Sequence, residues 1–199
     1  LLTSAGFDAL GIGSMEEPGF LREAGIELPM YFDQGMYSWN HLAGAAMERY
    51  GADRLTIPVE LNEREIRDSG VQGEMIVYGY LPMMISAQCI RKTTLGCSGK
   101  PEIMWLKDRK DMRFPVVNQC RFCYNTIYNS APLSLLGLSE QVTGLKPNAV
   151  RLNFTVEEPA AAGEILDAFF EEYGMSEKAA EPPVLRNQFT RGHFKRGVE

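Results

Sequence analysis

The chain has 199 residues, of which 45% are hydrophobic and 23% charged, and its formal net charge is −6. These fractions are those of a globular protein large enough to bury a core, and they exclude a disordered chain. No apolar run approaches the roughly 20 residues of a membrane span, and no secretory leader of basic then apolar residues begins the chain. We therefore expect a cytoplasmic protein that does not enter a membrane.

Short β-rich runs alternate with helical patterns along the chain. The expected strands are DALGIGS (8–14), PMYFDQG (29–35), RLTIPVELN (54–62), EMIVYGYLPMMIS (74–86) and AVRLNFTVE (149–157), with a sixth in NTIYNSAPLSLL (125–136). Alternation of strands and helices predicts an α/β fold made of parallel βα units.

Helix boundaries are indicated by capping residues. Apolar residues at helical spacing predict a helix over 39–50, with Ser38 as its N-cap. The patterns NERE (62–65) and TVEE (155–158) are typical of capping boxes, so each should begin a helix. The second of these helices should stop at Gly174.

Parallel βα units either form an open doubly wound sheet or close into a (β/α)8 barrel. The chain has no GxGxxG turn, which favours a TIM-like barrel. A full barrel has eight strands, and the chain starts without Met inside an apolar segment. We therefore expect an incomplete barrel whose missing N-terminal units lie upstream of Leu1 or on a partner chain. The prediction is one domain over 1–199, with a cysteine-rich insertion at 86–130 and a strapping tail at 175–199.

The segment 91–121 is basic although the whole chain is acidic. It holds eight Lys or Arg against three Asp or Glu, so its net charge is +5 and that of the remainder is −11. Such a segment suits RNA or an anionic small molecule, although an ordinary solvated loop has the same composition. The candidate substrate-binding residues here are Lys107, Arg109 and Lys110.

All four cysteines of the chain lie close together in the sequence, at Cys89, Cys97, Cys120 and Cys123. In a cytoplasmic chain, clustered thiols are metal ligands or small buried side chains, and clustering favours ligation. The CxxC pair can hold one metal site. The spacing leaves both zinc and a four-thiolate iron–sulfur cluster open.

Polar residues follow several predicted strands, where barrel enzymes carry their active sites. Asp33, Glu60 and Tyr80 are the candidate catalytic residues, and Asn129 is a further candidate for substrate binding. A serine triad is not indicated, because neither of the two histidines lies beside a nucleophile motif. The chain also lacks GxSxG and HExxH.

Two long runs make a resemblance recognisable. EMIVYGYLPMMISAQC (74–89) followed by MWLKDRKDMRFPVVNQCRFCYNTIYNSAPLSLL (104–136) closely resembles the U32 peptidase family, the collagenase-like proteases. PMYFDQGMYSWN and RLTIPVELN resemble consecutive strands of the family's barrel, and TRGHFKRGVE resembles the end of its core region. The resemblance covers nearly the whole chain and implies the C-terminal part of that barrel.

The resemblance has two functional implications. Some family members are reported to degrade collagen, whereas others support hydroxylation of a tRNA uridine, an rRNA cytidine or a quinone ring and carry a 4Fe-4S cluster. It therefore implies that the four cysteines are cluster ligands. We expect the full-length protein to be an iron–sulfur enzyme of RNA-base hydroxylation, with a peptidase as one alternative and a non-catalytic fragment with a structural metal site as another.

Overall fold

The computed structural model describes residues 6–174 and 188–198. The chain divides into two compact units, each assembled from separate segments, and each is described by itself. The first unit contains the chain up to Val77, Leu138–Arg151 and the segment from Arg191 onward. The second contains Tyr78–Gly137 and Leu152–Thr190.

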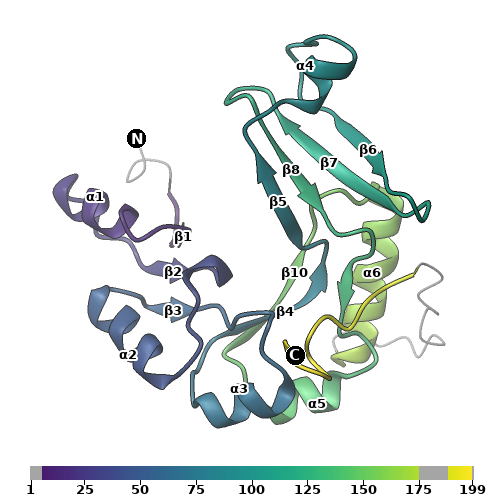
Figure 1. Cartoon of the computed structure of the whole chain (residues 1–199). Helices are drawn as coiled ribbons and strands as arrows, with labels where there is room; N and C mark the ends of the chain where they lie inside the picture. The colour runs from purple at the N-terminus through teal and green to yellow at the C-terminus, as the bar shows by residue number, and fades with distance from the viewer. Residues whose placement is uncertain (1–5, 175–187, 199) are drawn as a thin grey trace. The chain divides into compact units, whose positions relative to one another are not determined.

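A parallel sheet forms the centre of the first unit (Figure 1). Its strands, in spatial order, are β1 (Leu10–Ile12), β2 (Met30–Phe32) and β3 (Arg54–Leu55). Both strand pairs are parallel. The helices α1 (Glu17–Glu23) and α2 (His41–Tyr50) connect them. The prediction of parallel βα units is confirmed for these strands.

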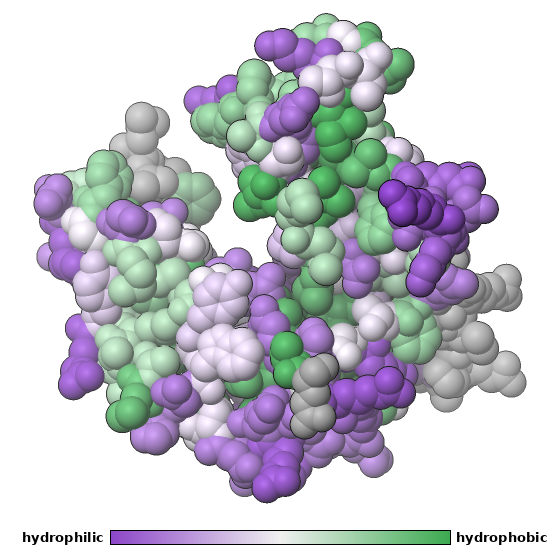
Figure 2. All heavy atoms as spheres, viewed as in Figure 1, coloured by the Kyte–Doolittle hydropathy of each residue, from purple (hydrophilic) through white to green (hydrophobic). Residues whose placement is uncertain are grey.

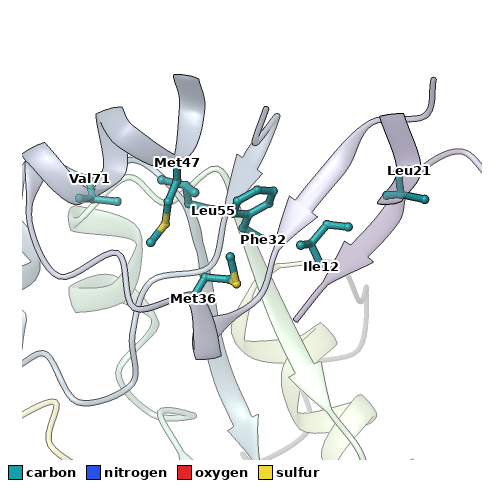
Figure 3. Close-up of a cluster of buried hydrophobic side chains, with 7 residues drawn as sticks. All are labelled: Ile12, Leu21, Phe32, Met36, Met47, Leu55 and Val71. Carbon is teal, nitrogen blue, oxygen red and sulfur yellow. The ribbon is translucent and has the colours of Figure 1, made fainter. Parts of the chain in front are cut away.

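The core of this unit lies between the sheet and its helices. Figure 3 shows a cluster of buried side chains in this core: Ile12, Leu21, Phe32, Met36, Met47, Leu55 and Val71. Phe32, on the middle strand, is fully buried. Each large apolar side chain buried in this way stabilises the fold by about 1.5–3 kcal/mol, so packing rather than helix propensity holds these short elements.

The start of α2 differs from the prediction. Ser38 is not its N-cap, because the helix begins two residues later than the sequence pattern indicates. Asn40 caps it instead, and its side-chain oxygen accepts hydrogen bonds from the backbone N–H groups of Leu42 and Ala43, both at 3.0 Å. The buried Ser38 hydroxyl donates to the carbonyl of Thr56 at 3.3 Å, so it bridges two loops rather than capping a helix.

The two predicted capping boxes have opposite outcomes. The box at 62–65 is confirmed at the start of α3 (Glu63–Ser69), where both reciprocal hydrogen bonds form. The box at 155–158 is wrong. Glu158 is the N-cap of α6 (Pro159–Glu172) and makes no side-chain capping bond. Pro159 at the first helical position lacks an N–H and has a φ suited to a helix start, so it begins this helix without a box.

Further strands surround β4 (Glu74–Gly79). A single parallel bridge joins Thr56 to Glu74, which continues the order of the parallel sheet to the start of β4. In its own sheet β4 lies between β10 (Ala149–Asn153) and β9 (Leu133–Ser134), and β9 is antiparallel to it. Within the described residues none of the three sheets closes into a barrel.

The cysteine-rich insertion is not a loop but a sheet with a short helix. Its antiparallel strands, in spatial order, are β5 (Pro82–Ser86), β8 (Tyr124–Tyr128), β7 (Arg113–Gln119) and β6 (Ile103–Lys107). The prediction of one strand over 74–86 is wrong, because the chain leaves β4 at Gly79 and enters this second sheet at Pro82. The sixth barrel strand predicted over 125–136 is also wrong, since β8 and β9 there are antiparallel to their neighbours.

The surface of this antiparallel sheet is partly apolar. Figure 2 shows hydrophobic residues exposed over β5 and β8, and hydrophilic residues at the tip of the β6–β7 hairpin. On β5, Met83, Met84 and Ile85 are exposed by 63%, 58% and 71%. The parallel strands of the first unit are buried, whereas this face of β5 is apolar and exposed to solvent.

The predicted C-terminal tail is described only in part, since residues 175–187 and 199 lie outside the described residues. In the second unit, Thr190 forms a parallel bridge with Leu133. In the first unit, Phe194 is buried and its carbonyl accepts a hydrogen bond from the backbone of Glu63 at 2.9 Å. Lys195 bonds to the side chain of Gln141, which belongs to α5 (Ser139–Gly144).

Candidate functional site

The segments that carry the four cysteines, α4 (Ile90–Thr94) with the loop after it and the β7–β8 hairpin loop, lie at one end of the antiparallel sheet (Figure 1). Cys89 is the N-cap of α4 (Ile90–Thr94), which follows β5, and Cys97 lies in the loop after this helix. Cys120 and Cys123 are the first and last residues of the four-residue hairpin loop between β7 and β8. Because β5 and β7 end where β6 and β8 begin, residues 34 positions apart in the sequence share one region.

The thiols are near one another but are not gathered on a centre. All four are free, and Cys97 and Cys123 are exposed. Partial desolvation raises the pKa of Cys120, and the nearby Cys97, Cys89 and Cys123 raise it further, whereas a hydrogen bond with Asn118 acts in the opposite direction. Among the described residues, no three potential metal-ligand side chains of Cys, His, Asp or Glu lie at ligating distances.

Hydrogen bonds and an ion pair connect the segments that carry the thiols. Glu102 accepts from Arg91 at 2.6 Å and from the Ser98 hydroxyl at 3.1 Å, which links α4 and the Cys97 loop to the start of β6. The sulfur of Cys120 lies 3.0 Å from the carbonyl oxygen of Lys100. The separate cysteine segments are therefore held together by contacts that involve no metal.

Two buried asparagines lie directly behind the hairpin loop. Asn118 and Asn125 are 1% and 0% exposed and are paired in register on β7 and β8. The side-chain N–H of Asn125 donates to the carbonyl of Gln88 at 2.9 Å, which fixes the residue before Cys89. The sequence analysis missed both residues, although the nearly symmetric run NQCRFCYN places an asparagine two residues outside each cysteine of the CxxC.

The side chain of Asn118 is suited to a thiolate. Its oxygen lies 2.9 Å from the sulfur of Cys120, while its buried Nδ2 has no hydrogen-bond partner among the described residues. Rotating the amide by 180° would turn this N–H donor toward the sulfur. Donors to a ligating sulfur stabilise its ionised form. In number and chemistry the four thiols fit a four-thiolate metal group, with Asn118 as an outer contact.

The predicted basic contacts lie at the tip of the β6–β7 hairpin. Asp108 accepts from the backbone N–H groups of Lys110 and Met112, at 2.7 and 2.9 Å, so the tip is a side-chain-stabilised turn. Lys107 forms an ion pair with Asp111 at 2.7 Å. Arg109 and Lys110 form no ion pair with any described residue, and both are exposed. Their charges are therefore available to an anionic partner.

The remaining predicted site residues do not form one group. Asp33 is held by Arg151 at 2.6 Å, and Arg151 also lies 3.1 Å from Glu74, so Asp33 belongs to an ion-paired network. Glu60 is half-exposed in a turn after β3. Both lie in the first unit, whereas Tyr80 lies in the second.

Asn129 has a local structural role in the second unit. Its side-chain oxygen accepts from the backbone of Ser130 at 2.8 Å, and its own N–H donates to Leu81 at 2.9 Å. These bonds shape the turn after β8. The side-chain oxygen of Asn129 is therefore already used within the turn. Its side-chain NH2 group makes no hydrogen bond in this turn.

Tyr80 has neighbours that the sequence analysis did not identify. Burial raises the pKa of Tyr80, and the charge of Glu157, which follows β10, raises it further. Burial and the same carboxylate also raise the pKa of Tyr78 and Tyr128. The sequence offered only a weak indication of this group, because its members lie up to 79 positions apart.

The structure thus defines an α/β protein with a parallel sheet in one unit and a thiol-bearing antiparallel sheet in the other. Comparison of the chain with family models, with curated proteins and with solved structures found no match. The resemblance to the U32 peptidase family therefore stays a prediction. No helix in residues 6–174 and 188–198 is both long enough and apolar enough to cross a membrane.

Proposed function

We propose that this chain is part of an iron–sulfur protein of the U32 peptidase family that acts in the hydroxylation of an RNA base. In the same proposal, the parallel strands belong to a TIM-like barrel whose other strands lie outside this chain. The observation that carries the proposal is that the antiparallel sheet brings the segments of all four cysteines to the same end. Four cysteine thiolates are the usual ligand set of a 4Fe-4S cluster.

Cys89, Cys97, Cys120 and Cys123 would hold the cluster. When bound, the cluster supplies one-electron transfer. The protein's part is to keep the thiolates together and to offset their negative charge. Glu102 draws together Arg91 and Ser98 and so orders the segments of Cys89 and Cys97. The basic segment 91–121 reduces the repulsion among the sulfurs.

The same sheet supports an RNA partner. Exposed bases in RNA are bound by aromatic side chains, while the phosphates attract Lys and Arg. Trp105 is 56% exposed and Phe122 is 68% exposed, and the guanidinium of Arg121 lies 5.4 Å from the centre of the Phe122 ring. Aromatic faces and unpaired cations therefore occur on the unit that carries the thiols.

The peptidase alternative has no matching support from an acid–base pair. His193 contacts the carbonyl of Gly197 through Nδ1 at 2.7 Å, and His41 is exposed at the first residue of α2. Among the described residues, neither histidine contacts a side chain that could act as a nucleophile. Hydrolysis of a collagen-derived peptide by the purified chain, with no iron bound, would overturn the proposed function.

The direct experiment is anaerobic purification followed by iron, sulfide and zinc analysis. We expect about four irons and four sulfides per chain and broad visible absorbance. Single replacement of any cysteine by serine should reduce iron content, whereas Leu95→Ala, an uncharged and exposed position between Cys89 and Cys97, should leave it unchanged. Stoichiometric zinc without sulfide would refute the iron–sulfur assignment and support a structural zinc site.

A further inference from the structure

The sulfur of Cys120 is in contact with two oxygen atoms. It lies 2.9 Å from Oδ1 of Asn118 and 3.0 Å from the carbonyl oxygen of Lys100. A thiol carries one hydrogen, so it can donate to one of these oxygens at a time. A metal-bound sulfur has lost this hydrogen and carries negative charge, so both oxygens then meet it as acceptors. Ligation by Cys120 therefore makes these contacts unfavourable as they stand.

The two oxygens differ in how they can give way. The carbonyl of Lys100 belongs to the backbone that leads into β6, and the Ser98 hydroxyl lies 3.2 Å from it. The backbone N–H of Lys100 also donates to the Ser98 oxygen, at 3.3 Å. Turning this carbonyl away would move the loop, whereas the Asn118 amide can turn about a single side-chain bond. We therefore expect the change to occur at Asn118.

The opposite end of the Asn118 amide is a donor without an acceptor. Its Nδ2 is buried and has no hydrogen-bond partner among the described residues, and the residue is 1% exposed. Asn125, its in-register neighbour on β8, has a buried Oδ1 that also lacks a partner there, so the two amides do not bond to each other. A buried donor in this state has lost its hydration without compensation. A half-turn of the amide exchanges its two ends and places this donor at the sulfur.

This arrangement distinguishes Cys120 from the other three cysteines. The sulfur of Cys123 lies 3.8 Å from the carbonyl of Cys120, and those of Cys89 and Cys97 have no hydrogen-bond partner within the part of the chain that the structure describes. Cys97 and Cys123 are also exposed, whereas Cys120 is half-buried. A hydrogen bond to a charged acceptor is stronger where water is partly excluded. Of the four thiols, Cys120 is therefore the one that a side-chain donor can serve.

We propose that Asn118 reverses its amide when a metal group binds, so that its Nδ2–H donates to the ligating sulfur of Cys120. In the metal-free chain the same amide accepts from the Cys120 thiol. Asn118 is thus a positioning residue, because it acts on the metal through Cys120 and does not touch it. The inference rests on the ligand set of the proposed function but not on iron, since the sulfur lacks its hydrogen in any four-thiolate site, zinc included.

The test is NMR of the isotope-labelled chain loaded with an NMR-active isotope of cadmium, which occupies thiolate sites in place of zinc. A hydrogen bond from an N–H group to a metal-bound sulfur transmits spin coupling between the metal nucleus and the hydrogen. We expect this coupling at the side-chain amide of Asn118. None should occur at that of Asn125, the internal control, whose N–H donates to the carbonyl of Gln88. Cadmium bound by the four thiols without coupling at Asn118 would overturn the inference.

A variant supplies a second measurement, the retention of cadmium against a chelator. Asn118→Leu keeps the size of the side chain but has no N–H, and it should bind cadmium about tenfold more weakly. Gln119→Leu is the matched control, since the next side chain on β7 points to the opposite face of the sheet and its loss should leave the affinity unchanged. An unchanged affinity in Asn118→Leu, or an equal loss in both variants, would refute the role of the N–H group.

The inference and the proposed function fail separately. Coupling at Asn118 in a chain that takes up zinc but no iron or sulfide would support the inference and refute the iron–sulfur function. A chain that binds iron and sulfide but shows no coupling in its cadmium form would keep the proposed function and overturn the inference.

Discussion

Replacement of Asn125 by alanine should release the segment that carries Cys89. Asn125 is fully buried, and its side-chain N–H donates to the carbonyl of Gln88 at 2.9 Å. Among the described residues this carbonyl has one other side-chain donor, the hydroxyl of Ser86 at the longer distance of 3.3 Å. Asn125→Ala therefore removes the shorter of two bonds that hold the residue before Cys89.

The expected magnitude follows from burial. Loss of a buried hydrogen bond that leaves its partner poorly satisfied costs about 1–3 kcal/mol. The Oδ1 atom of Asn125 already lacks a partner among the described residues, so its removal adds no further loss. Taking about 2 kcal/mol, the segment should open about 30 times more often.

The assay is alkylation of the metal-free, reduced chain, followed by mass spectrometry of each cysteine. In Asn125→Ala, Cys89 should be alkylated up to about 30 times faster, and the backbone amides of residues 88–91 should exchange their hydrogens faster. Cys97 is the internal reference, because its neighbour Ser98 is held by Glu102 instead. Ser86→Ala, which removes only the longer bond, should change the rates little. Equal acceleration at Cys89 and Cys97 would refute the positioning role and make Asn125 an ordinary core residue.

Three further predictions concern RNA binding, pH and the core. Charge reversal at the β6–β7 tip should weaken RNA binding and reduce its salt dependence, with Arg64→Glu on α3 as the control; unchanged binding would indicate a solvated turn. The residues to reverse are Lys107, Arg109 and Lys110. In Glu157→Gln the phenolate absorbance should develop at lower pH, because the carboxylate helps to raise the tyrosine pKa values. Because the tyrosine pKa values are raised in the folded protein, the stability that the tyrosines contribute should be complete below pH about 10. It should fall as pH rises through the folded-state pKa values. Denaturant unfolding at several pH values measures this change. Phe32→Ala should lower the free energy of unfolding by about 3–5 kcal/mol, whereas Leu42→Ala, 69% exposed on α2, should change it by about 0.5 kcal/mol or less.

The sequence by itself determined the parallel strands of the first unit, the capping box at 62–65 and the clustering of the cysteines. These features depend on neighbouring residues: a short apolar run bounded by polar turns, an Asn three residues before a Glu, and thiols close in the chain. Local patterns of this kind carry their own physical cause. The caps of the helices that begin at His41 and Pro159 were misplaced because several nearby polar residues compete for one cap, and only the backbone geometry selects among them.

Only the tertiary structure decided how the insertion folds and which polar groups meet. The run 74–86 is apolar throughout, and nothing in its pattern says that its second half pairs with β8 rather than continuing β4. The bond from Asn125 to Gln88 spans 37 positions, and the group of Glu157 and the tyrosines spans up to 79. Such contacts follow from strand pairing between distant segments, and the free energy of that pairing depends on the packing of both partners at once.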